Sequence, residues 1–175
     1  SIEQSHDVPF FIEEVRGNPF RLYVDIDIKR TVEVPFDASA VIQAICAYTK
    51  EMFPPAEVTC LSVECHGEWK DTKCADVKFK SGFRIYFQRV FVTEEVYQRY
   101  MRRLAHWCRS NLDDDVIPFL PENTSWDDVV DQQSSGWDRG RLLGTIKRRK
   151  SLQRVYSFHG MFNETGPLSA LSDTF

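Results

Sequence analysis

The sequence of 175 residues lacks the hydrophobic segments that mark membrane proteins and secreted precursors. No apolar run approaches the ~20 residues that a transmembrane helix needs. The start, SIEQSHDVPFF, has no basic region followed by an apolar one, as a signal peptide would. These absences predict a soluble, intracellular protein that is not attached to a membrane. Internal repeats and low-complexity tracts are also absent from the sequence.

Cysteine is scarce and is not arranged in pairs. The chain has five cysteines, an odd number, and no CxxC motif. This pattern argues against a disulfide scaffold, gives little support to a structural zinc site, and favours a reducing compartment. With 42% hydrophobic and 27% charged residues, the composition is typical of one globular domain with a buried core. We therefore expect residues 1–175 to form a single domain.

Charge of one sign is missing from each of two stretches. Residues 113–131 contain seven acids and no lysine or arginine, whereas residues 139–154 contain seven basic residues and no acid. A metal-binding edge followed by a phosphate-binding edge would give this order, although a charge run is more often only a solvated surface. The net charge of −4 argues against non-specific coating of DNA but leaves room for a basic cleft.

The hydrophobic pattern predicts alternating helices and strands. A first strand is followed by a helix at 38–53 capped by Asp37, strands at 57–65 and 75–92, and a helix at 94–109. We expect the longer strand to be broken or turned at Ser81 and Gly82. This order predicts an α+β fold with a mainly antiparallel sheet, helices packed on one face and a working face on the other.

The first strand, RLYVDIDIK at residues 21–29, carries two acids in an otherwise apolar pattern. Its alternation places Asp25 and Asp27 on the same face, with Cα atoms roughly 6.5 to 7 Å apart. Two carboxylates so close repel one another unless a cation lies between them, and a divalent metal would supply it. The alternative is a solvent-exposed face on which both acids are simply hydrated. If this strand pairs with the one at 75–92, Arg84 and Tyr86 lie beside the acids.

A third acid could complete such a metal site. In WDDVVD at residues 126–131, Asp131 follows two valines, so a short apolar strand could carry it into the site while Asp127 and Asp128 stay outside. Two-metal sites hold ions ~3.5 to 4 Å apart with bridging or flanking carboxylates. Asp131 is therefore our candidate for the further oxygen ligand.

These segments, in this order, resemble the motifs of the archaeo-eukaryotic primase superfamily. The similarity is closest to its primase-polymerase branch, including the primase domains of large-DNA-virus helicase-primases. LYVDID resembles the first motif, KSGFRIYF the second, WDDVVD the third, and GRLLGTIK a downstream basic segment. The second motif departs from the family because Arg84 stands where the family has histidine. The resemblance extends from Arg21 to Gly166.

The resemblance implies an RRM-like catalytic core that performs template-directed nucleotidyl transfer, as a DNA primase or DNA polymerase in replication or damage tolerance. By this resemblance the catalytic and metal-binding residues, which would hold two Mg²⁺ or Mn²⁺ ions, are Asp25, Asp27 and Asp131. The residues expected to bind the nucleotide are Arg84, Arg141 and Lys147. Further candidate contacts to nucleic acid are Lys80, Tyr86, Arg148, Arg149 and Lys150.

The partners implied are nucleoside triphosphates and a single-stranded DNA template or primer-template, at a site of DNA replication. Because the first motif lies near the start of the chain, we expect a fragment of a longer protein with a helicase or zinc-binding domain. Two alternatives remain open. The substitution at Arg84 fits an inactive primase-like module that binds nucleic acid or protein, and the acids alone fit a two-metal nuclease.

Overall fold

A computed structural model describes residues 19–33, 37–68, 77–112, 117, 124–131, 146–149 and 152–168, without the side chains of 146–149 and 152–155. Its main sheet has five strands in the order β1-β3-β2-β6-β7, and every neighbouring pair is antiparallel. The strands are β1 (Phe20–Arg30), β2 (Thr59–Glu68), β3 (Phe79–Val92), β6 (Ser157–Asn163) and β7 (Gly166–Pro167). A separate two-stranded hairpin is formed by β4 (Ile146–Arg149) and β5 (Leu152–Val155).

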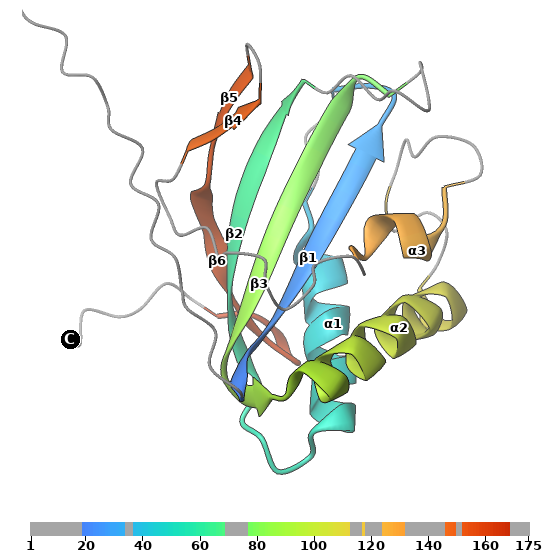
Figure 1. Ribbon diagram of the computed structural model, residues 1–175, viewed down its shortest axis with the longest axis vertical. Coiled ribbons are helices and arrows are strands. Elements are labelled where there is room, and N and C mark those ends of the chain that lie inside the picture. Colours follow the sequence, from blue (N-terminus) through green and yellow to red (C-terminus); the bar gives the residue numbers. More distant parts are fainter. Residues whose placement is uncertain are drawn as a thin grey trace, which may run out of the picture.

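Two long helices accompany the sheet, α1 (Ser39–Met52) and α2 (Glu94–Asn111). In Figure 1, α1 lies behind the strands and α2 crosses the lower end of the sheet beside β1. The α2 helix begins as predicted, because the Thr93 side chain accepts a hydrogen bond from the Val96 amide. In α1 the cap position is Ala38 instead of Asp37, although Asp37 Oδ1 accepts a hydrogen bond from the Ser39 amide at 2.9 Å.

The core lies between the helices and one face of the sheet. Alternate residues of β1 fill it, since Leu22, Val24, Ile26 and Ile28 are all buried. On β3 the same face is formed by Phe83, Ile85 and Phe87. The helices contribute large side chains such as Ile45 of α1 and Leu104 of α2, both fully buried. Each side chain of this kind stabilises the fold by roughly 1.5 to 3 kcal/mol.

The α+β architecture, the antiparallel sheet and the placement of the helices on one side are confirmed. The expected break at Ser81 and Gly82 is wrong, because β3 pairs continuously with both β1 and β2 through these residues. Neighbours on both sides supply hydrogen bonds along β3, so a small residue does not end the strand. Among the described residues, no helix is long and apolar enough to cross a lipid bilayer.

Candidate functional site

The second face of the sheet, opposite the face that packs on α1, carries the acids of β1 (Figure 1). On β1 it is formed by Tyr23, Asp25 and Asp27, which alternate with the core residues. The structure excludes a simply hydrated surface position for Asp25, which is only 9% exposed, whereas Asp27 is half-buried. A carboxylate that is removed from water needs a partner charge or hydrogen bonds.

Arg84 is that partner for Asp25. The two residues are Cα partners on the neighbouring strands β1 and β3. Nε and Nη2 of Arg84 donate to Oδ1 and Oδ2 of Asp25, both at 2.5 Å, which gives a bidentate ion pair. Arg84 is itself only 7% exposed, and its guanidinium lies 5.5 Å from the ring centroid of Tyr23. The residue at the motif position of the family histidine is therefore held on the first aspartate of the site.

Lys80 plays the same part for Asp27. Its Nζ donates to Asp27 Oδ2 at 2.5 Å, and Lys80 is 7% exposed. Gly82 is the Cα partner of Asp27, and a Cβ atom at this glycine would come 3.4 Å from Asp27 Oδ1. The absence of a side chain at Gly82 thus leaves space beside the Asp27 carboxylate. Each acid of β1 has its own cation on β3.

Asp131 reaches the site from another part of the chain. The segment that precedes it is a short helix, α3 (Trp126–Val129), so the predicted strand at this place is wrong. A capping box formed by Ser125 and Asp128 stabilises this helical turn. Val129 is therefore helical although it is β-branched and apolar.

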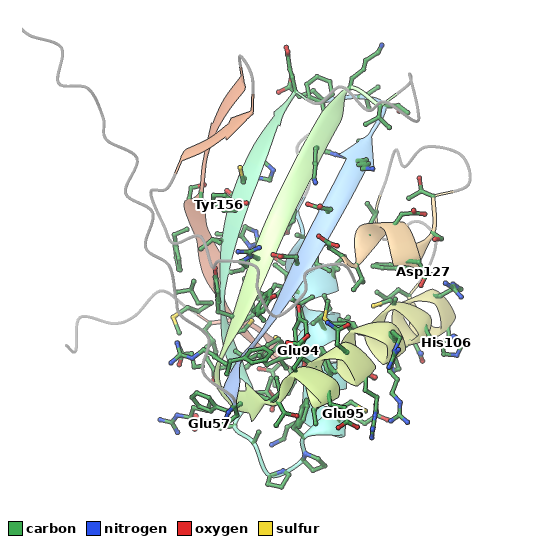
Figure 2. All side chains as sticks on the ribbon, viewed as in Figure 1. Glu57, Glu94, Glu95, His106, Asp127 and Tyr156 are labelled. Carbon is green, nitrogen blue, oxygen red and sulfur yellow. The ribbon has the colours of Figure 1, made fainter. Side chains whose placement is uncertain are left out.

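A single strand-like bridge follows α3. Val130 forms an antiparallel bridge with Ile26, and the Asp131 amide donates to the Asp25 carbonyl at 3.0 Å. Val130 packs in the core with Ile26. Since residues next to an antiparallel bridge also face each other, Asp131 stands opposite Asp25 on the second face. As predicted, Asp127 is exposed; it pairs with Arg109. Figure 2 shows Asp127 on α3, away from the sheet.

The three aspartates interact electrostatically. Burial raises the pKa of Asp25 above its ordinary value, and the negative charges of Asp27 and Asp131 raise it further, while the Arg84 guanidinium acts in the opposite direction. Burial alone would lower the pKa of Arg84, but its attraction to Asp25 raises that pKa, so Arg84 keeps its positive charge. A further cation near Asp25 would therefore stabilise the ionised form of its carboxylate.

The carboxylate oxygens of the three aspartates fit a divalent metal ion, but two of the aspartates pair with basic side chains of the protein. Three carboxylates are the oxygen ligands that Mg²⁺ and Mn²⁺ prefer. Among the described residues, however, no three His, Cys, Asp or Glu side chains are grouped so as to hold a metal ion. Instead, Asp25 and Asp27 are directed to Arg84 and Lys80. A metal ion at these acids would compete with Arg84 for both oxygens of Asp25 and with Lys80 for Oδ2 of Asp27.

Tyrosines surround the pair of Asp25 and Arg84. Tyr86 is the Cα partner of Tyr23, and burial raises the pKa of Tyr86 to about 12 although Arg84 acts to lower it. Tyr23 stacks on Tyr97 of α2, with ring centroids 5.1 Å apart. The sequence pattern points to Tyr86 and misses Tyr23 as a site residue, although the alternation that groups Asp25 with Asp27 also includes Tyr23.

The basic segment is only partly described. Arg141 and Lys150 lie outside the described residues, and Lys147, Arg148 and Arg149 are placed by the backbone of β4 alone. The hairpin of β4 and β5 lies near β2 and β6, whereas the three acids lie at β1, the opposite edge (Figure 1). The roles of these five residues stay predictions.

Comparison with known proteins adds an independent result. No match was found among curated proteins or among solved structures. The family model described as Prim-pol 4 matches residues 3–107, which include β1, β3 and the acids Asp25 and Asp27 but end before Asp131 and the basic segment. The match covers more than half of the sequence and contains both ion pairs of the site, so the chain belongs to the Prim-pol 4 family.

Proposed function

We propose that the chain is a primase-polymerase domain that joins nucleotides on a single-stranded DNA template. The observation that carries this proposal is the placement of Asp25, Asp27 and Asp131 on one face of the sheet, with two buried cations beside them, in a chain of the Prim-pol 4 family. The resemblance of the motifs to the primase domains of large-DNA-virus helicase-primases supports the same activity.

The residues of the site have distinct tasks in this proposal. Asp25, Asp27 and Asp131 would hold two Mg²⁺ or Mn²⁺ ions, and these ions would supply a lower pKa for the attacking 3′-hydroxyl and charge neutralisation for the triphosphate. When a ligand draws Asp25 away, Arg84 becomes available to bind phosphate oxygens with the same two nitrogens that now bind the carboxylate. Lys80 does the same as a point charge once Asp27 is drawn away.

The permanent charge of Arg84 distinguishes this site from one with histidine. A histidine changes its charge near neutral pH, whereas arginine keeps its charge at every working pH. We therefore expect nucleotide addition to show no loss attributable to a histidine between pH 6 and 7. Lys147 and Arg141 remain our candidates for further contacts to the triphosphate, by resemblance to the family.

The test is extension of a labelled primer on a template with Mg²⁺ or Mn²⁺, comparing the wild type with Asp131→Asn. We expect this change to reduce extension on the order of a hundredfold or more, because it removes a charge that would stabilise the transition state. The matched control is Asp127→Asn, four positions earlier on the outer side of α3, whose exposed pair with Arg109 contributes little. We expect the control to keep the wild-type rate.

Two results would contradict the proposal. Cleavage of the primer without extension would identify a two-metal nuclease. Binding of the primer-template with neither extension nor cleavage would favour a catalytically inactive nucleic-acid-binding module. The ion pair of Asp25 and Arg84 is the observation that favours this second candidate, because it occupies the carboxylate that a metal would need. Equal rates for wild type and Asp131→Asn would remove Asp131 from the site.

A further inference from the structure

The second face continues beyond the acids into an apolar region on β2 and β6. Val63 and Cys65 of β2 and Tyr156 form a small buried cluster there, with Leu61 and Tyr86 packed against it. Figure 2 shows Tyr156 at this edge of the sheet, where β6 begins. Next to the cluster on β6, Phe158 is 52% exposed. A large aromatic side chain thus stands in solvent on the same sheet that carries the candidate site.

The pairing of the strands places Phe158 in line with the acids. Asp25 pairs with Arg84, Arg84 with Val63, and Val63 with Phe158. Opposite residues of antiparallel strands share one face, so these four side chains form a row across the second face. With strands ~4.8 Å apart, Phe158 lies roughly 14 Å from Asp25. Stacked nucleotides rise ~3.4 Å each along a strand, so about four of them span this distance.

A β-bulge sets the direction of Phe158. Between Ser62 and Val63 the partner on β6 shifts from Gly160 to Phe158, so His159 is an extra residue without a counterpart on β2. The His159 ring packs toward the core, against Phe83 and Phe162. Bulges re-aim the neighbouring side chains, and they are frequent beside functional sites. Here the bulge lets His159 fill the core face while Phe158 faces the other way.

The segment that precedes Phe158 is basic and would contact phosphates instead of bases. The hairpin formed by β4 and β5 leads directly into β6, and residues 146–155 contain five basic residues and no acid. Single-stranded nucleic acid is held by this combination, in which aromatic side chains stack on bases and a basic track binds the phosphates. Exposed aromatic residues on a sheet are a common way to bind unpaired bases.

We propose that Phe158 is a base-stacking site for single-stranded nucleic acid and that the strand runs from the β4–β5 hairpin over β6 toward Asp25. The inference rests on the proposed function in taking a single-stranded template as the ligand, but it does not require catalysis. It names the residue that positions the unpaired bases about four nucleotides from the acids.

The experiment measures binding of the whole chain to two fluorescent oligonucleotides by polarisation. One is a single strand of deoxythymidines, and the other has the same length and backbone but only abasic sites. The variants are Phe158→Ala, Phe158→Trp and the control Phe91→Ala. Phe91 is a matched control because it is also exposed, at 58%, but lies near the far end of β3.

We expect Phe158→Ala to weaken binding of the base-containing strand by about tenfold, because one stacking contact is lost. Phe158→Trp and Phe91→Ala should both bind the base-containing strand with the affinity of the wild type. On the abasic strand, Phe158→Ala and wild type should bind equally. Because Phe158 is exposed, its replacement should not alter the thermal unfolding midpoint, which is recorded for each variant.

Three results would overturn the inference: wild-type affinity for Phe158→Ala on the base-containing strand, equal weakening on both strands, or no binding of single strands by the wild type. The outcome is separable from primer extension. A chain that fails to extend primers but binds bases through Phe158 refutes the polymerase and keeps the stacking site. A chain that extends primers with an unaffected Phe158→Ala variant refutes the stacking site alone.

Discussion

At the scale of single residues, the distinctive feature is the buried ion pair of Asp25 and Arg84. Removing two charges from water costs free energy, and only the bidentate geometry and the mutual attraction offset that cost. Such a pair therefore contributes more to the arrangement of a site than to its stability. In this protein it fixes the orientation of the carboxylate that begins the acidic motif.

The pair predicts an asymmetry between single and double substitutions. Replacing Arg84 with methionine leaves the Asp25 carboxylate buried without its cation, so the free energy of unfolding should fall by about 3 kcal/mol or more. Adding Asp25→Leu removes the remaining charge and should recover most of that loss. Urea unfolding of the wild type, both single variants and the double variant measures the coupling. Additive losses would show that the pair does not act as a unit.

The same variant tests the competition between Arg84 and a metal. If Asp25 can bind a divalent ion, Mn²⁺ should raise the unfolding midpoint of Arg84→Met by more than it raises that of the wild type, because the carboxylate is no longer occupied. Thermal unfolding with and without Mn²⁺ measures this difference, and Ca²⁺ in a parallel series separates specific from general ionic effects. An equal response of both proteins would argue against a metal on Asp25.

At the scale of elements, the helices are joined by a buried polar contact. The Thr49 hydroxyl of α1 donates to the Ile45 carbonyl at 2.6 Å and lies 2.7 Å from the Tyr100 hydroxyl of α2. Since the proton of Thr49 is already used, Tyr100 donates to Thr49. Both residues are almost completely buried. This hydrogen bond sets how α1 and α2 meet beneath the sheet.

The contact predicts that two similar deletions have unequal effects. Thr49→Val keeps the side-chain shape but leaves the Tyr100 hydroxyl buried without an acceptor, so the free energy of unfolding should fall by about 1 to 3 kcal/mol. Tyr100→Phe removes the hydroxyl itself and leaves Thr49 bonded to Ile45, so its cost should be smaller. Denaturant unfolding of the two variants compares them. A larger loss of stability for Tyr100→Phe than for Thr49→Val would contradict the assignment of Tyr100 as donor and Thr49 as acceptor.

At the scale of the whole molecule, stability below neutral pH depends on a histidine that the fold partly buries. Burial lowers the pKa of His159, while the charges of Glu64 and Asp37 act in the other direction. The unfolded chain, with an ordinary pKa of 6.5, therefore takes up the proton first as the pH falls. Stability from this residue is complete above that value and is lost as the pH falls through the lowered pKa.

This linkage predicts a pH dependence that one substitution removes. His159→Phe keeps an aromatic ring between Phe83 and Phe162 and cannot be protonated. The wild type should lose more stability than the variant between pH 7.5 and pH 5, measured by urea unfolding at both values. An equal loss in the two proteins would assign the acid sensitivity to groups other than His159.

The sequence by itself determined the features that depend on local periodicity. Alternation over residues 20–30 fixed both the core face of β1 and the common face of Asp25 and Asp27, because successive side chains of a strand point to opposite sides. Helical periodicity and Thr93 fixed α2, and the two prolines after Met52 fixed the end of α1. The order of the motifs along the chain also indicated the primase-polymerase family.

Only the tertiary structure decided which charges meet. The register of β1 against β3 places Arg84 on Asp25, while the side-chain contact of Lys80 with Asp27 crosses to a residue that is not its Cα partner. A one-residue change of register would separate these groups, and no single segment encodes it. The same holds for Asp131, which reaches Asp25 through the bridge after α3. Local sequence patterns identify the residues of the site. Contacts between distant segments determine which of these residues are partners, because the energy of strand pairing depends on the whole sheet.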